Sequence, residues 1–353
     1  MELTPARIIE RAVADRAFPA AVVETGTRQR VVWRRAFGTL TYERDSPPTR
    51  EDTTFDLASL TKVIATTTIA MRAVDEGRIA LDEHVADRLP YWRGADRERV
   101  TIADLLEHAS GLTAYLPFFR DHRGRREFER AICTMPLEYA PRTQSIYSDL
   151  GFMLLAFILE DTYAQPFASV FDAALANLMS RGTDDLLFNP PRELRDRCAP
   201  TELDLWRGRL LQGEVHDENC YALGGSAGHA GLFGTAEGVG SFARVMLNRF
   251  GNRTLERFVS KSAVPGSSRA LGWDTMLTTS SCGTCMSPRA IGHTGFTGTS
   301  LWIDPELDLY VVMLTNRVHP SRENNQIQAV RRAFHDAVAR GRKSEVGARG
   351  SEV

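Results

Sequence analysis

Residues 55–85 read FDLASLTKVIATTTIAMRAVDEGRIALDEHV, and they place a serine and a lysine at the start of a predicted helix. Apolar residues recur at helical spacing after this point, which predicts a helix from Ser59 to Glu76 that ends at Gly77. A separation of three residues puts Ser59 and Lys62 on one face of that helix, about 5–6 Å apart at Cβ. The helix N-terminus also favours negative charge on the serine oxygen. The pattern predicts a nucleophile beside a base, although an N-capping serine followed by an exposed lysine gives the same pattern.

Lysine is rare in this chain, which adds weight to Lys62. Of the 43 lysine and arginine residues only three are lysines, at positions 62, 261 and 343. Arginine keeps its proton near neutral pH, whereas a lysine can be tuned to act as a base. Because desolvation disfavours the charged form, we expect a lowered pKa for Lys62 in a buried site.

Two later segments carry further reactive side chains. Residues 147–149 (Tyr-Ser-Asp) precede an apolar helical run, and a tyrosine there can carry protons if a nearby cation lowers its pKa. Residues 293–295 (His-Thr-Gly) lie inside a predicted strand, where a glycine often marks close approach of a ligand or of another backbone. Taken singly, the first segment is also typical of a tyrosine packed on a helix capped by Asp149, and the second of a bulge in an edge strand.

Strand patterns occur near both ends of the chain, and helical patterns fill the middle. Runs rich in valine and aromatic residues predict a hairpin between residues 20 and 37 and three strands between residues 291 and 315. The segment between these regions carries helical runs joined by polar loops with proline and glycine. We predict an α/β domain built from residues 1–78 and 213–340, a mostly helical domain from residues 79–212, and a disordered tail from residues 341–353.

Composition and charge are those of an ordinary globular protein. The chain has 353 residues, of which 43% are hydrophobic and 25% charged, and its net charge of −2 favours neither nucleic acid nor a membrane surface as a partner. The most apolar stretch, residues 150–159, is about half the length that spans a bilayer, so it predicts a buried helix. Five cysteines and a charged N-terminus indicate a cytoplasmic protein without a disulfide framework or a signal peptide.

In this order, the three motifs resemble those of the serine β-lactamase and penicillin-binding protein family: Ser-x-x-Lys, then Tyr-Ser-Asp, then His-Thr-Gly. The similarity extends from residue 5 to residue 340 and includes the segments LLEHASGL, APRTQSIYSDLGFMLLAFILE, GHAGLFGTAEGVGSFARVM and GHTGFTGTSLWIDPELDLYVVMLTNRVHP. The motifs are most similar to the class C-like branch, which holds class C β-lactamases, D-Ala-D-Ala carboxypeptidases, D-amino-acid peptidases and family VIII-type carboxylesterases. The resemblance implies a β-lactamase/transpeptidase-like α/β (α+β) fold, with an antiparallel sheet flanked by N- and C-terminal helices and an inserted, mostly helical domain.

The resemblance also implies a role for each motif residue. Ser59 would be acylated, while Lys62 and Tyr147 would share the proton transfers. The backbone N–H groups of Ser59 and Phe296 would form an oxyanion hole. Asp149 stands where the family often has asparagine, and it would lie near Lys62 in a supporting role. The residues implied to line the substrate strand are Thr294, Gly295 and Phe296. No metal or other cofactor is implied.

His293 is the main departure, because β-lactamases carry lysine at this position. A fixed positive charge there helps to hold a substrate carboxylate, whereas histidine is only partly charged near neutral pH. We therefore expect a serine hydrolase that acts through an acyl-enzyme on a carboxylic ester or on an amide or peptide containing a D-amino acid, with weak or no β-lactamase activity. The expected partner is such a small molecule, without nucleic acid or membrane.

Three alternatives remain open from the sequence. The protein could be a β-lactamase, or a penicillin-binding-like sensor that turns over slowly. A metal-dependent hydrolase would use His216 and His229 with the adjacent carboxylate of Asp217, but these residues lack a tight ligand spacing. Cys282 and Cys285 form a single Cys-x-x-Cys pattern without a second pair, and no role follows from it.

Overall fold

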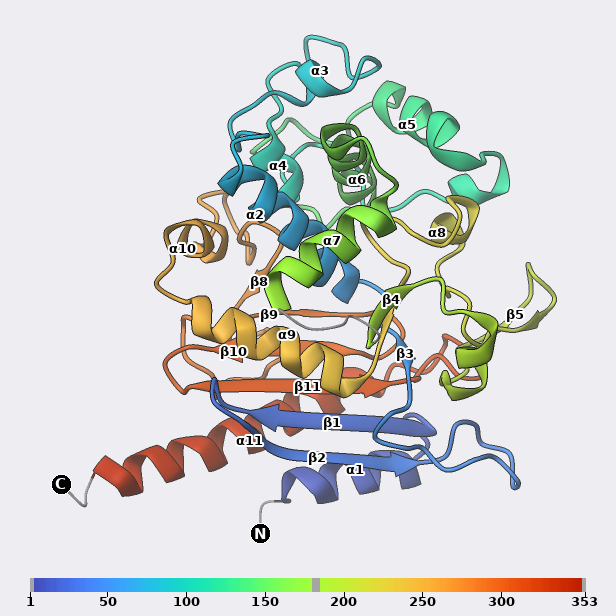
Figure 1. Cartoon of the computed structure of the whole chain (residues 1–353), viewed down its shortest axis with the longest axis vertical. Coiled ribbons are helices and arrows are strands. Elements are labelled where there is room, and N and C mark those ends of the chain that lie inside the picture. The colour runs from blue at the N-terminus through green and yellow to red at the C-terminus, as the bar shows by residue number, and fades with distance from the viewer. Residues whose placement is uncertain (1–2, 180–184, 351–353) are drawn as a thin grey trace.

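A six-stranded antiparallel sheet, built from both ends of the chain, forms the base of the molecule (Figure 1). The structure is a computed structural model that describes residues 3–179 and 185–350. The strand order is β2-β1-β11-β10-β9-β8. The strands are β1 (Ala20–Gly26), β2 (Val31–Gly38), β8 (Asp274–Thr275), β9 (Ile291–Thr294), β10 (Ser300–Asp304) and β11 (Leu309–Thr315). The predicted hairpin and the three C-terminal strands are thus confirmed, and β1 and β11 join the two ends of the chain as neighbours.

Helices cover both faces of this sheet. The terminal helices α1 (Pro5–Ala14) and α11 (Ile327–Gly350) pack on one face, and α9 (Ala236–Arg249) lies on the other (Figure 1). The central strands β1 and β11 are buried along their whole length because both of their faces are covered. This arrangement confirms the predicted β-lactamase/transpeptidase-like fold class.

The remaining helices gather above the α9 face of the sheet. The apolar run at residues 150–159 forms the buried core of α6, as the sequence predicted. The helices above the α9 face of the sheet are α2 (Thr68–Asp75), α3 (Val85–Arg88), α4 (Ile102–Leu106), α5 (Gly124–Thr134), α6 (Asp149–Tyr163), α7 (Phe167–Met179), α8 (Glu218–Ala222) and α10 (Arg253–Val259). One apolar cluster includes Leu154 of α6 and Leu301 of β10, so the helices and the sheet share a core. The division into two domains at residues 79 and 212 stays a prediction.

Two smaller sheets of short strands accompany the six-stranded sheet. A three-stranded sheet has the order β3-β7-β4, with β3 (Phe55–Asp56), β7 (Leu232–Gly234) and β4 (Leu186–Phe188). A separate hairpin consists of β5 (Leu203–Asp204) and β6 (Arg209–Leu210). In the part of the chain that is described, no helix combines the length and the apolar character needed to cross a membrane.

The helix that follows Ser59 differs from the predicted regular α-helix. Residues Lys62–Thr67 are π-helical, and the α-helix α2 begins only at Thr68. Two threonine hydroxyls support the wider turn, because Thr67 Oγ1 donates to the carbonyl of Lys62 and Thr68 Oγ1 to that of Val63, each five residues back. Single π-helical turns within helices occur often at functional sites.

The C-terminal helix continues beyond its predicted end. Residues 341–350, for which the sequence predicted a disordered tail, belong to α11. Arg342 ties this part to the turn between β10 and β11, since its Nε donates to the carbonyl of Leu307 at 2.9 Å. The polar composition of residues 341–345 therefore reflects a helix in contact with solvent, and residues 351–353 lie outside the described part.

Candidate active site

Ser59 sits at a sharp connection between β3 and the helix that follows. Ala58 adopts a left-handed conformation with φ of 47°, which is unusual for a residue with a Cβ. Its N–H donates to Asp56 Oδ1 at 2.8 Å, and the N–H of Leu57 donates to the carbonyl of Leu232 in β7. These bonds fix the strained residue directly before Ser59, so the hydroxyl is presented at the end of a rigid strand.

Lys62 is fully buried and uses its ammonium group in three contacts. Nζ donates to Ser59 Oγ at 3.0 Å, to Asp149 Oδ1 at 2.6 Å and to the carbonyl of His229 at 3.1 Å. Burial lowers the pKa of Lys62, but the negative charge of Asp149 outweighs this effect and holds the pKa above its usual value. The expectation of a lowered pKa is therefore wrong, because desolvation is offset by an adjacent carboxylate.

Tyr147 lies beside both members of the pair. Its side chain interacts with Ser59 and Lys62, and Lys62 Nζ is 4.8 Å from the centre of its ring. Burial raises the pKa of Tyr147, and the positive charge of Lys62 opposes this only in part. At neutral pH the tyrosine therefore keeps its proton while the lysine keeps its charge.

The third motif lies against the strand that precedes Ser59. Thr297 Oγ1 donates to the carbonyl of Asp56 at 2.7 Å, and Thr299 Oγ1 donates to that of Leu57 at 2.9 Å. A Cβ on Gly295 would lie 2.5 Å from the carbonyl oxygen of Leu57, so this position requires glycine. The glycine thus marks a close backbone approach. β8 pairs only with Ile291 and Gly292 of β9, so His293 and Thr294 pair with β10 on one side and with no strand of the described residues on the other.

Two backbone N–H groups near the serine are free to bind an oxyanion. Within residues 3–179 and 185–350, neither the N–H of Ser59 nor that of Phe296 donates a hydrogen bond. Phe296 follows Gly295 at the end of β9, and its carbonyl is held by Arg317 Nε at 2.8 Å. This is the arrangement that stabilises a negative oxygen in acyl transfer.

His293 is buried and electrically neutral. Its Nδ1–H donates to the carbonyl of Thr294 at 2.8 Å, and its Nε2 has no partner among the described residues. Burial, reinforced by the charges of Arg269 and Lys62, lowers its pKa well below the usual value. The sequence suggested a partial charge at this position, but the structure gives none near neutral pH.

Two cavities open on Ser59. The first, of about 440 Å³, is bordered by the second and third motifs and by the side chains of Arg269, Arg317 and Arg331. The second, of about 350 Å³, also borders Tyr147 and is lined by Tyr115, His216, Asp217, His229 and Arg322. Ser59 and Phe296 border both cavities, so a bound molecule can extend to either side of the serine.

Of the three arginines that line the first cavity, Arg269 pairs with the acidic side chain of Asp274 at 3.9 Å, whereas Arg317 and Arg331 have no ion-pair partner among the described residues. Arg331 Nη2 donates to the carbonyls of Gly295 and Thr299, at 2.7 and 2.8 Å, and its Nε is buried without a partner. Burial lowers the pKa of Arg331 to about 9, and Arg317 adds to this effect. Among the described residues, neither Arg317 nor Arg331 forms an ion pair, because both donate to backbone carbonyls. Sequence patterns gave no sign of this cavity.

The histidines of the second cavity pair with separate carboxylates. His216 Nε2 contacts Glu202 and His229 Nε2 contacts Asp217, each at 2.9 Å. Burial would raise the pKa of Asp217, but His229 holds it well below its usual range. No group of three or more metal-binding side chains occurs in the described ranges, so these residues do not converge on one point.

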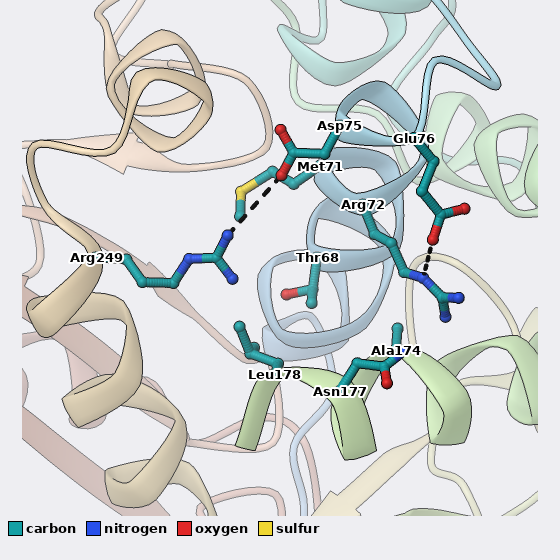
Figure 2. A pocket seen from close by; sticks show the side chains of 9 residues that line it. All are labelled: Thr68, Met71, Arg72, Asp75, Glu76, Ala174, Asn177, Leu178 and Arg249. Carbon is teal, nitrogen blue, oxygen red and sulfur yellow. Dashed lines mark hydrogen bonds and ion pairs between the residues drawn. The ribbon is translucent and has the colours of Figure 1, made fainter. Parts of the chain in front are cut away.

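A further cavity lies behind the nucleophile helix, between α2, α7 and α9. Figure 2 shows it bordered by Arg249 and Asp75, which lie 3.9 Å apart, and by the Arg72–Glu76 ion pair at 2.6 Å. It has a volume of about 240 Å³ and contains none of the predicted site residues. The Cys-x-x-Cys segment borders neither cavity at Ser59. Its loop is held against α11, where Asp336 accepts hydrogen bonds from the N–H groups of Thr284 and Cys285.

The fold and the family of the chain define a serine hydrolase. The model of the Beta-lactamase family matches residues 5–334, and the chain therefore belongs to the β-lactamase family. It is 30% identical over 354 residues to the "N-acetylmuramyl-L-alanine amidase" of Bacillus subtilis (strain 168), with 89% of this chain and 80% of the relative covered. It is 31% identical over 313 residues to a "Putative D-alanyl-D-alanine carboxypeptidase" of Salmonella gallinarum, with 78% and 72% covered.

Solved structures share the fold at lower sequence identity. The hydrolase EstCE1, described as having promiscuous acyltransferase activity, has a TM-score of 0.76 and 20% identity, with 95% of this chain and 97% of that chain covered. A class C β-lactamase from Rhodobacter sphaeroides has a TM-score of 0.75 and 18% identity, with 95% and 98% covered. These likenesses support the fold.

Proposed function

We propose that the protein hydrolyses an ester or amide through an acyl-enzyme on Ser59. The observation that carries this proposal is the 3.0 Å contact between Lys62 Nζ and Ser59 Oγ, beside Tyr147 and two free N–H groups. Ser59 Oγ attacks the carbonyl carbon as its proton passes to Lys62 or Tyr147. The N–H groups of Ser59 and Phe296 stabilise the oxyanion. The leaving group then takes the proton, and water releases the acid from Ser59.

The reactive form of the site has lost one proton from the Lys62–Tyr147 pair. Both groups are protonated at rest because their pKa values are raised. Since the two groups interact directly, the proton is lost from the pair as a unit, with an apparent pKa that belongs to neither side chain alone. The proposed enzyme therefore becomes more active as the pH rises toward that apparent pKa.

The arginine-lined cavity supports a substrate that carries a carboxylate near the scissile bond. A buried guanidinium group without a counterion is unfavourable, and a substrate carboxylate would supply one. Arg331 and Arg317 would provide the charge that the neutral His293 lacks. Relatives named as an amidase and a carboxypeptidase support an amide or peptide containing a D-amino acid as the first substrate to test. Because a β-lactam carboxylate could bind the same arginines, the neutral His293 alone no longer argues against β-lactamase activity, and a β-lactam belongs among the substrates to test.

A substrate panel tests this function. Wild type and Ser59→Ala are incubated with a p-nitrophenyl ester, D-Ala-D-Ala peptides, D-aminoacyl amides and nitrocefin. We expect turnover of at least one ester or D-amino-acid substrate that disappears in Ser59→Ala. Labelling by a fluorophosphonate without turnover of any substrate would favour a penicillin-binding-like sensor instead. Efficient nitrocefin hydrolysis would favour a β-lactamase instead.

A further inference from the structure

We propose that His108 is a positioning residue that aims Tyr147 at Ser59. The inference rests on the proposed function, because it assumes that Tyr147 moves protons for that serine. His108 follows α4 and adopts a left-handed conformation with φ of 58°. It is buried, with only 1% of its surface exposed, and no sequence motif assigned it to the site.

His108 holds the residues on both sides of Tyr147. The N–H of Ile146 donates to the His108 carbonyl at 3.0 Å. The N–H of Ser148 donates to His108 Nδ1, also at 3.0 Å. Since the flanking peptide groups are both fixed to one residue, the direction in which Tyr147 leaves the backbone is fixed as well.

The imidazole ring also supports the phenol ring directly. The two ring centres are 4.8 Å apart, and the other face of His108 stacks on Phe152 of α6 at 5.0 Å. Three other groups surround Tyr147: Lys62 Nζ at 4.8 Å, the Arg269 guanidinium at 5.1 Å and the His293 ring at 5.7 Å from its centre. Removal of the imidazole would therefore take away one of the four groups that contact the phenol ring.

The contacts require a neutral imidazole with its proton on Nε2. Because Nδ1 accepts a hydrogen bond from a backbone N–H, it cannot carry a proton itself. Burial and the charges of Arg269 and Lys62 lower the pKa of His108 well below its usual value, which favours this neutral state. A protonated ring could not accept the hydrogen bond from the Ser148 N–H. The hydrogen bond and the lowered pKa therefore both indicate a neutral imidazole.

Two variants separate the two contacts. His108→Phe keeps an aromatic ring but removes the acceptor for Ser148. His108→Asn keeps an acceptor near the position of Nδ1 and tolerates the left-handed backbone, but it removes the ring. We expect each variant to lower kcat by about 10- to 100-fold with KM changed less than about threefold, because misplacement of a catalytic group affects mainly the chemical step. His84 is exposed, so His84→Asn serves as the control and should have the kcat and KM of the wild type.

A double-mutant cycle with Tyr147→Phe decides whether His108 acts through Tyr147. If it does, His108→Asn changes kcat by less than about twofold in the Tyr147→Phe background, since the group that it positions has already lost its hydroxyl. An equal loss in both backgrounds, or a wild-type kcat in His108→Asn, would overturn the inference. Should His108→Phe fail to fold, His108→Asn carries the test alone. If the wild type shows no Ser59-dependent turnover, the proposed function itself fails. If the wild type is active but His108→Asn lowers kcat equally with and without Tyr147→Phe, only the inference about His108 fails.

Discussion

Asp149 Oδ1 lies 2.6 Å from Lys62 Nζ, and this ion pair determines which form of the site is at rest. The lysine is fully buried, whereas the aspartate side chain is 18% exposed. Without Asp149, burial would favour a neutral lysine that could accept the serine proton at once. With it, the lysine stays charged, so activation in the proposed mechanism depends on loss of a proton from the Lys62–Tyr147 pair.

Asp149→Asn tests this relationship through the pH dependence of kcat/KM. The negative charge of Asp149 raises the pKa values of both Lys62 and Tyr147. Removal of that charge makes the pair lose its proton more easily, so the rising limb of the profile should move to lower pH by about one unit or more. Asp161→Asn, in the same helix but paired with Arg125, should leave the limb in place. A limb that stays in place or moves to higher pH in Asp149→Asn would contradict the assignment.

Lys62→Arg tests whether the lysine must exchange a proton. Arginine keeps a positive charge near Asp149 but does not release its proton at accessible pH. We expect kcat/KM to fall by about 100-fold or more, the contribution typical of a positioned acid or base. Lys261→Arg makes the same change at an exposed position and should have no effect. Comparable activity of Lys62→Arg and wild type would show that the lysine acts only through its charge.

Arg331→Gln and Arg317→Gln test the cationic cavity. Activity is compared on a peptide with a free C-terminal carboxylate and on the same peptide with a carboxamide. The ratio of kcat/KM values should fall by about tenfold or more in each variant, because a charge-assisted contact is lost only for the carboxylate. Using the ratio cancels any general disturbance of the strand that the arginines hold. Arg249→Gln, at the cavity of Figure 2, should leave the ratio unchanged. An unaltered ratio in both test variants would refute a carboxylate site here.

Ala58→Gly tests the strain before the nucleophile. A left-handed conformation costs a residue with a Cβ about 1–2 kcal/mol, whereas glycine adopts it freely. After allowance for the more flexible unfolded chain, the free energy of unfolding should stay constant or rise by up to about 1 kcal/mol. Ala70→Gly, inside α2, should instead lower it by about 1 kcal/mol or more. Chemical denaturation of both variants measures the difference, and a clear destabilisation by Ala58→Gly would show that the position carries no strain.

Local patterns in the sequence were sufficient to predict several of the buried strands and helices. The valine-rich runs predicted β1 and β11, and the apolar run at residues 150–159 predicted α6, because burial sets the composition of such segments. The π-helical turn at Lys62–Thr67 was not predicted. Its threonine-to-carbonyl bonds span five residues, and single-residue propensities do not describe that spacing.

The electrostatics of the site depended on contacts between distant segments. The raised pKa of Lys62 comes from Asp149, which is 87 residues away in sequence. Arg331 reaches the site from α11, a helix whose pattern gave no reason to connect it with Ser59. His108 lies in the segment LLEHASGL, which contributed to the family resemblance, but its contact with residues 146–148 becomes visible only in three dimensions. The motifs therefore predicted which side chains react, whereas the charge states of those side chains depended on the fold.

The most direct test of the account is the mass of the protein during turnover. Wild type is mixed with an ester or D-amino-acid substrate, quenched in acid, and its intact mass and peptides are measured. We predict a mass increase equal to the acyl group, located on the peptide that contains Ser59, and no increase in Ser59→Ala. Turnover that persists in Ser59→Ala, or an acyl group on another residue, would contradict the central claim that Ser59 is the nucleophile.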